Sequence, residues 1–147
     1  MQPTPSAARA ALVELSGEPL DVGAHLTAVA SPRAGAVASF IGQVRDHDPD
    51  APGPVVRLEY RAHPDALAVL RRLANEIAGR ADVLGVAVSH RVGAAAVGEL
   101  ALVAIVATAH REAAFSHCRD LVERVKQELP VWKRQVLADG SHAWIGL

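Results

Sequence analysis

Hydrophobic and polar residues follow two different periods along this chain, and the two periods predict a mixture of strands and helices. Segments in which apolar residues are continuous or recur at every second position are typical of strands. Segments in which they recur every three or four positions are typical of helices. The first kind predicts strands at 11–15, 35–44, 55–60, 83–92, 99–108, 131–137 and 143–145. The second kind predicts helices at 22–30, 64–80 and 109–129.

Glycine, proline and aspartate mark the connections between these segments. The stretch 46–54 is rich in Asp, Pro and Gly and predicts an exposed loop. The small residues of 93–98 predict a turn, and Pro130 ends the longest predicted helix. Because several consecutive strands can pair as hairpins, we expect an α+β fold with mixed or antiparallel sheets and a long helix in the C-terminal half.

Length and composition limit the kinds of protein that this chain can be. It has 147 residues, half of them hydrophobic and 3% aromatic. We therefore expect one domain over 1–147, with 1–10 as a flexible leader and a core of Ala, Val and Leu. The formal net charge is −1, so no global field attracts nucleic acid or membrane, and any cationic site must be local. The absence of a membrane-length apolar run and of a secretory signal, with one cysteine, favours a cytoplasmic location.

The last third of the chain carries the most suggestive basic residues. His110 and Arg111 open the longest predicted helix, Lys126 lies in its last turn, and Lys133 follows just past its end. Unpaired backbone N–H groups at a helix start favour anions, whereas a basic pair there disfavours the helix itself. The pair therefore indicates either a phosphate site or an accidental surface pair. In the first interpretation, all four groups converge around one anion.

Two further observations bear on the cations. Two lysines held near each other lower the pKa of one of them, which then suits it to act as nucleophile or general acid. The position of Lys126 is also explained by the helix dipole and by Glu123 as a salt-bridge partner. Arg45 ends a predicted strand at the mouth of the 46–54 loop and offers bidentate phosphate contacts. On spacing alone, a solvated strand-end arginine is the stronger interpretation of Arg45.

Other reactive residue types are better explained without chemistry. Asp46, His47 and Asp48 are metal-ligand types, but no second cluster completes a coordination shell, so we expect no metal. Cys118 falls on the apolar face of the longest predicted helix and is expected to be a buried, inert thiol. His90 and Arg91 form a basic corner for which we favour a structural or rim role. No phosphate-binding or dinucleotide glycine motif is present, and no cofactor is expected.

Several short motifs, taken together and in order, resemble the large, catalytic subunit of molybdopterin synthase. The resemblance covers about residues 34 to 145. The motifs are Phe-Ile-Gly-Gln-Val-Arg (40–45), Leu-Glu-Tyr-Arg-Ala-His (58–63), His-Arg-Val-Gly (90–93), Gly-Glu (98–99), Ala-His-Arg-Glu-Ala-Ala-Phe (109–115), Lys126 and Pro-Val-Trp-Lys-Arg (130–134). Gln43 departs from the pattern, because many relatives carry lysine there, so one cation of the usual rim is missing.

The resemblance implies an α/β hammerhead-type fold and a homodimer. It implies a small ubiquitin-like sulfur-carrier subunit at each end, giving a heterotetramer, whose C-terminal Gly-Gly tail carries a thiocarboxylate. The substrate would be cyclic pyranopterin monophosphate (precursor Z) and the product molybdopterin, in molybdenum cofactor biosynthesis. The basic pocket of the family maps onto Arg45, His110, Arg111, Lys126 and Lys133.

Roles for these residues follow from the implied chemistry. Lys126 is expected at the thiocarboxylate, as acid or transient nucleophile, and Lys133 is expected to polarise the substrate and help to open its cyclic phosphate. Substrate binding would fall to Arg45, His110 and Arg111. Phe40 is expected to shape the pocket or the dimer contact. The alternatives are a non-catalytic module that binds a phosphate ligand or carrier tail, and a purely structural dimeric protein.

Overall fold

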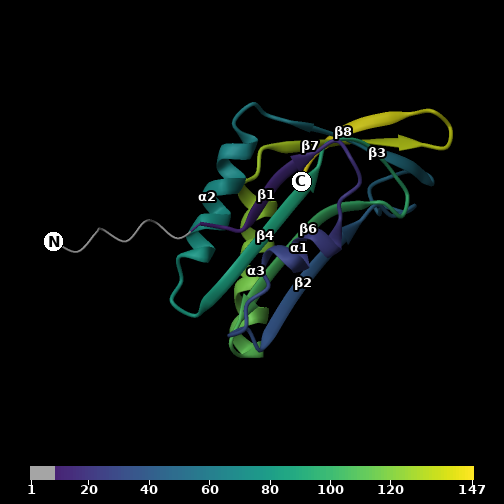
Figure 1. The fold of residues 1–147 in the computed structure, drawn as a ribbon. Coiled ribbons are helices and arrows are strands. Elements are labelled where there is room, and N and C mark those ends of the chain that lie inside the picture. Colours follow the sequence, from purple (N-terminus) through teal and green to yellow (C-terminus); the bar gives the residue numbers. More distant parts are fainter. Residues whose placement is uncertain (1–8) are drawn as a thin grey trace.

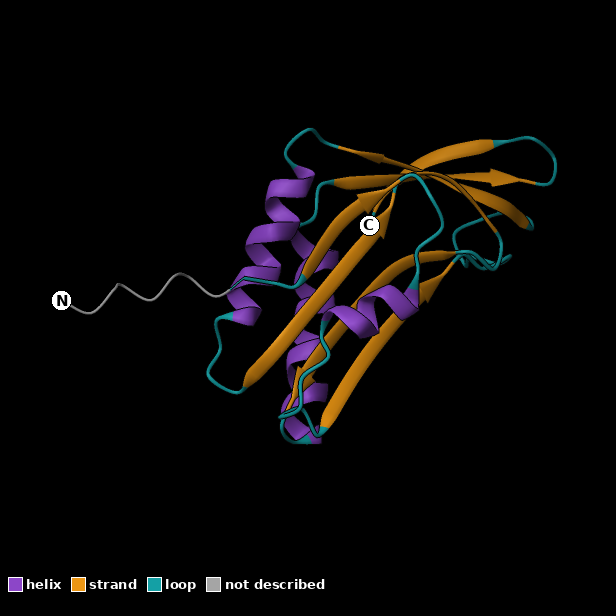
Figure 2. Cartoon of the chain, in the orientation of Figure 1, coloured by secondary structure: helices purple, strands orange, loops and turns teal. Residues whose placement is uncertain are grey.

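The computed structural model describes residues 9–147, in which two four-stranded sheets and three helices form the fold (Figures 1 and 2). The elements are β1 (Leu12–Ser16), α1 (Val22–Ala28), β2 (Ala36–Gln43), β3 (Val55–Ala62), α2 (Ala66–Ala78), β4 (Val83–Arg91), β5 (Gly93–Ala96), β6 (Leu100–Thr108), α3 (Arg111–Glu128), β7 (Val131–Leu137) and β8 (His142–Gly146). The α+β class, the mixed and antiparallel sheets and the long helix in the C-terminal half are confirmed. Residues 1–8 of the predicted leader lie outside the described residues.

The first sheet has the strand order β1-β4-β6-β2. β1 pairs with β4 in parallel, and the other neighbours are antiparallel. α2 and α3 cover one face, whereas α1 lies against β4 and β6 on the other (Figure 1). Because β4 and β6 are central and covered on both faces, their apolar runs are nearly continuous. β2 is an edge strand of this sheet, with β6 as its one neighbour in the order.

The second sheet has the order β5-β3-β7-β8, is antiparallel throughout and lies across one end of the first sheet (Figure 2). The chain passes from β4 into β5 of this sheet at Gly93, whose φ of +80° lies in the left-handed region that favours glycine. The prediction of a turn over 93–98 is partly wrong, because Gly93–Ala96 forms β5. Pairing with β3 overrides the weak strand preference of alanine there.

α3 begins two residues later than predicted, because His110 keeps an extended backbone as its N-cap. The start of β2 lies against the residue before this cap. The Gly35 N–H donates to the Thr108 carbonyl at 3.1 Å, and a Cβ at position 35 would come within 2.4 Å of the Ala109 oxygen. Only glycine fits this approach, which brings the start of β2 to the start of α3. Neither α3 nor the other helices of residues 9–147 are long and apolar enough to cross a membrane.

Candidate active site

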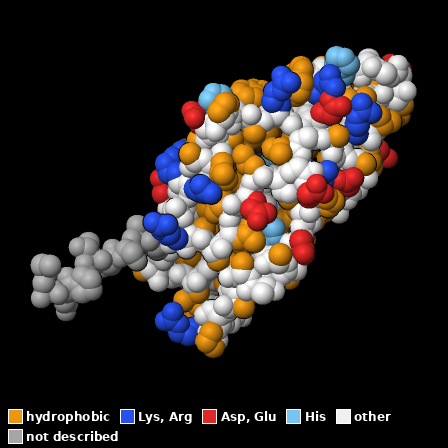
Figure 3. All heavy atoms as spheres, turned by 45° about the horizontal axis from the view of Figure 1, so that its top comes forward, with side chains coloured by type: hydrophobic (Ala, Val, Ile, Leu, Met, Phe, Trp, Pro, Cys, Tyr) orange, Lys and Arg blue, Asp and Glu red, His pale blue; other side chains and the backbone are white. Residues whose placement is uncertain are grey.

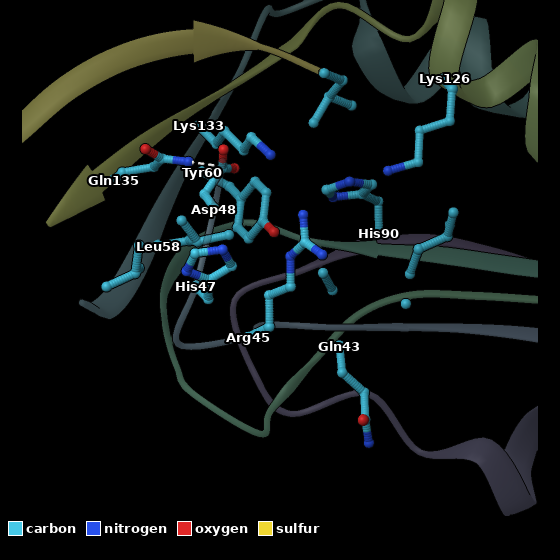
Figure 4. A pocket seen from close by; sticks show the side chains of 15 residues that line it. Gln43, Arg45, His47, Asp48, Leu58, Tyr60, His90, Lys126, Lys133 and Gln135 are labelled. Carbon is cyan, nitrogen blue, oxygen red and sulfur yellow. Dashed lines mark hydrogen bonds between the residues drawn. The ribbon is translucent and has the colours of Figure 1, made fainter. Parts of the chain in front are cut away.

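A cavity of about 220 Å³ lies between the second sheet and the end of the first (Figure 4). The cavity is lined by residues from the end of β2, the loop that follows it, both sheets and the last turn of α3. The lining residues are Gly42, Gln43, Arg45, His47, Asp48, Val55, Leu58, Tyr60, His90, Ala101, Leu102, Lys126, Lys133, Gln135 and Leu147. Segments that are far apart in the sequence therefore meet here.

Three of the predicted site residues come together in this cavity. Lys126 enters from α3, Lys133 from β7, and Arg45 from just past β2. In Figure 4 their charged ends point into the same space. On the face drawn in Figure 3, by contrast, basic and acidic side chains are interspersed. The concentration of positive charge is thus local, as a net charge of −1 requires for an anion site.

The pairing of β3 with β7 determines which side chains face the cavity. Lys133 lies opposite Tyr60 and Gln135 lies opposite Leu58 in this register. Side chains two positions apart point to the same face of a strand, so Lys133 and Gln135 enter the cavity together. The sequence reasoning missed Gln135, although the alternation that starts from Lys133 predicts it.

His90 forms the buried wall beside Lys126. It is 2% exposed, its Nδ1 donates to the Arg91 carbonyl at 2.7 Å, and its ring meets that of Tyr60 edge-on. Burial lowers the pKa of His90 to about 4, and the nearby charge of Lys126 acts in the same direction. His90 is therefore neutral at physiological pH, with Nε2 left as an acceptor. Its place in the cavity follows from the face that it shares with Val86 and Val88 on β4.

The pKa of Lys126 is lowered, first by burial of its ammonium end and then by the charge of Lys133. Glu123 acts in the opposite direction. The residue as a whole is exposed, and its ammonium points towards His90 in Figure 4. A lowered pKa brings the free amine and the ammonium closer in energy, which suits a group that donates a proton or attacks a carbonyl.

Asp48 is the acidic side chain among the residues that line the cavity. Its Oδ1 accepts a hydrogen bond from the Asp50 N–H at 2.9 Å, and its Oδ2 accepts one from Gln135 Nε2 at 2.6 Å. These bonds lower the pKa of Asp48, with smaller effects from Lys133 and Arg45. An ionised carboxylate is thus held among the cations. Within residues 9–147, no three His, Cys, Asp or Glu side chains gather in a way that could hold a metal ion.

His110 and Arg111 lie elsewhere, in a separate shallow hollow with Gly35 and Glu112. Arg111 and Lys126 stand 15 positions apart on α3, which is about 22 Å along a helix axis. The expectation that all four basic groups converge around one anion is therefore wrong for a single chain. The length of the helix that separates them is the physical reason.

Phe40 also lies outside the cavity. It is 38% exposed and lines an open groove with Phe115, which is 68% exposed. Cys118 forms the floor of this groove, and its thiol is buried and donates to the Ala104 carbonyl. Burial raises the pKa of Cys118, so the thiolate is disfavoured, as expected of an inert thiol.

Comparison with known proteins gives one consistent result. Residues 15–128 match the family model described as MoaE protein. The chain is 36% identical over 133 residues to molybdopterin synthase catalytic subunit 1 of Mycobacterium tuberculosis, covering 90% of this chain and 88% of that protein.

Solved structures share the fold. Molybdopterin synthase from Staphylococcus aureus superposes with a TM-score of 0.80 at 24% identity, covering 97% of this chain and 98% of that one. A complex of subunits 1 and 2 of molybdopterin-converting factor from Helicobacter pylori contains a chain with a TM-score of 0.72 at 18% identity, covering 92% and 90%. These likenesses confirm the fold class predicted from the sequence.

Proposed function

The chain belongs to the MoaE protein family, and from this premise we propose that it is the catalytic subunit of a molybdopterin synthase. It converts precursor Z to molybdopterin in the cytoplasm, with sulfur from the C-terminal thiocarboxylate of a small ubiquitin-like carrier. The observation that carries this proposal is the convergence of Arg45, Lys126 and Lys133 on one cavity in a chain of net charge −1.

The cavity suits two negatively charged guests. The substrate carries a cyclic phosphate, and the carrier tail ends in an anionic thiocarboxylate. Arg45 offers two parallel N–H donors to phosphate oxygens. Lys133 projects from a rigid strand, pairs with Tyr60 across the sheet, and polarises the phosphate as its ring opens. These contacts leave Lys126 for the tail.

Lys126 acts where sulfur is transferred. Its lowered pKa makes it a competent acid, or a transient nucleophile towards the tail carbonyl. The neutral His90 beside it presents an acceptor that orients the ammonium without neutralising it. Two sulfurs must be added, so the half-converted substrate stays in the cavity while one carrier is exchanged for the next.

A second copy of the chain completes the site. β2 is an edge strand, and exposed apolar side chains stand on both of its faces: Val37 and Ile41 on one, Phe40 with Phe115 on the other. An open backbone edge flanked by apolar surface is suited to pairing with another strand. The matching strand is available in an identical chain.

Two-fold pairing of β2 with its copy also explains the separated cations. The start of β2 adjoins Gly35 and the hollow of His110 and Arg111, whereas its end adjoins Gln43 and Arg45 at the cavity. Antiparallel self-pairing brings the start of one β2 beside the end of the other. His110 and Arg111 of each copy then reach the cavity of its partner, where they bind the phosphate and pterin.

The carrier is a separate small subunit. The Helicobacter pylori structure, which holds two different subunits in one complex, supports this assignment. With one carrier at each cavity of a homodimer, the assembly is a heterotetramer.

Reconstitution tests the proposal. The purified chain, a thiocarboxylated Gly-Gly carrier and precursor Z should yield the dithiolene product in a reaction that requires all three. Binding of carrier and precursor Z without product would instead favour the non-catalytic module. Failure to bind either would favour a purely structural protein.

A further inference from the structure

We propose that Asp48 recognises the guanidine-like edge of the pterin ring and so selects the ring system that enters the cavity. This inference rests on the proposed function, which supplies a pterin as substrate. The edge in question carries a ring N–H and an adjacent amino group, two donors that point in the same direction. A carboxylate presents two acceptors at matching spacing and binds such an edge bidentately, as it binds arginine.

The carboxylate of Asp48 is held in place before any ligand arrives. The Asp50 N–H fixes Oδ1 and the Gln135 amide fixes Oδ2. Gln135 is buried in β7, so one of these anchors belongs to the rigid sheet and not to the loop. A carboxylate accepts about four hydrogen bonds, and the two anchors leave one acceptor position on each oxygen for a ligand.

The cavity separates its charges along its length. In Figure 4, Lys126 and His90 lie on one side, Asp48 and Gln135 lie on the other, and the charged ends of Lys133 and Arg45 point into the space between. A ligand with an anionic group at one end and a donor edge at the other matches this arrangement. Leu58, opposite Gln135 on the paired strand, adds an apolar surface for a planar ring.

A carboxylate in a site for anions needs such an explanation. Placed near Lys133 and Arg45, it opposes the binding of a bare phosphate. Its presence is favourable only if the ligand brings hydrogen-bond donors to it. The competing explanation is that Asp48 merely balances the two cations and is displaced by any anion that enters. The two explanations predict opposite effects of removing its charge.

The variant Asp48→Asn separates them by calorimetric titration with precursor Z and with inorganic phosphate. We expect precursor Z to bind about tenfold more weakly, because a charge-assisted bidentate contact is lost. Phosphate should bind as well as before or more tightly, which also shows that the cavity is intact. Tighter binding of both ligands would overturn the proposal. Asp46→Asn is the matched control, with the same charge change in the same loop outside the cavity lining, and should alter neither affinity.

The ring itself provides a second measurement. Pterin and lumazine differ in that lumazine carries a carbonyl oxygen where pterin carries the amino group. In competition against precursor Z, the unaltered protein should prefer pterin, and Asp48→Asn should lose that preference. Equal competition by both rings in the unaltered protein would contradict the proposal. A failure of the proposed function appears differently, as absence of product in the full reconstitution with unaltered Asp48.

Discussion

The two ends of α3 carry the same kinds of residue in very different surroundings. At its C-terminal end, Lys126 meets Arg45 and Lys133 in a walled cavity. At its N-terminal end, His110 and Arg111 stand exposed in an open hollow. At the first end, the pKa of Lys126 is lowered and the buried His90 lies beside it. One end is therefore a walled cavity within the single chain, whereas the other joins a site only in the dimer that we propose.

The largest effect is expected at the C-terminal end of α3. Lys126→Ala should lower turnover by about 10² or more, because it removes the group that we propose acts at the transferred sulfur. The measurement is product formation with saturating precursor Z and thiocarboxylated carrier. Gln127→Ala, an exposed neighbour that does not line the cavity, is the control and should keep normal turnover. Near-normal turnover by Lys126→Ala would remove Lys126 from the mechanism.

A sharper test substitutes a residue at one end of α3 in one chain and a residue at the other end in the partner chain. Arg111→Ala should weaken precursor Z binding by about tenfold, through loss of a charge-assisted phosphate contact. Lys126→Ala and Arg111→Ala chains, co-expressed with different tags and purified through both, form mixed dimers. One cavity of each mixed dimer then has both residues intact, so about half of normal activity returns. If both residues served the same chain's cavity, no cavity of the mixed dimer would keep both, and the cavity that retains Lys126 would bind precursor Z about tenfold more weakly.

Most helices and strands could be predicted from the sequence, because the hydrophobic periodicity of a segment and the Gly, Pro and Asp residues that end it are local signals. The exception was β5, where Gly93–Ala96 pairs with β3 and no local signal marks the strand. Long-range pairing decides such a segment, and one sequence does not reveal it.

The site was predictable in its chemistry but not in its geometry. Lys126 and Lys133 suggested an anion site by residue type, the family resemblance added Arg45, and the fold brings the three together. Asp48 was weighed only as a metal ligand, because its bond to Gln135 joins residues 87 positions apart. The expected convergence with Arg111 neglected the length of α3, which local reasoning about helix ends does not include.

The proposed dimerisation through β2 can be tested directly. Ile41→Glu places a charge on the apolar face of the paired strands in each copy, so the protein should sediment as a monomer. Precursor Z should bind about tenfold more weakly or worse, as in Arg111→Ala, because each cavity would lose the proposed cations of the partner. Ile41 is 40% exposed, so the fold tolerates the change. Val56→Glu, at a 43% exposed position on β3, is the control and should remain dimeric. A dimeric Ile41→Glu protein would place the interface elsewhere.

A smaller effect is expected on stability. The pKa of Lys126 lies below its ordinary value near 10.5 in the folded state, so the unfolded chain holds more protons between the two values. Stability therefore rises with pH through that window, and the full penalty of the buried ammonium applies below it. Lys126→Met should melt at a higher temperature than the unaltered protein at pH 7, and the difference should shrink towards pH 10. If the difference in melting temperature does not depend on pH, side-chain packing explains it and the charge of Lys126 does not. Gln127→Met controls for the added apolar side chain.

The smallest effect on ligand binding is expected at the rim of the cavity, at Gln43. The family resemblance implies a lysine at the position of Gln43, and Figure 4 shows the side chain of Gln43 pointing away from the cavity. Gln43→Lys restores a cation at an exposed position, where charges act through solvent and are screened by salt. We expect precursor Z to bind about twofold more tightly at low ionic strength, with no gain near 0.5 M salt. A gain that persists at high salt would mean that residue 43 contacts the ligand directly, and the cavity would then extend along β2 towards the hollow that the proposed second copy would bring.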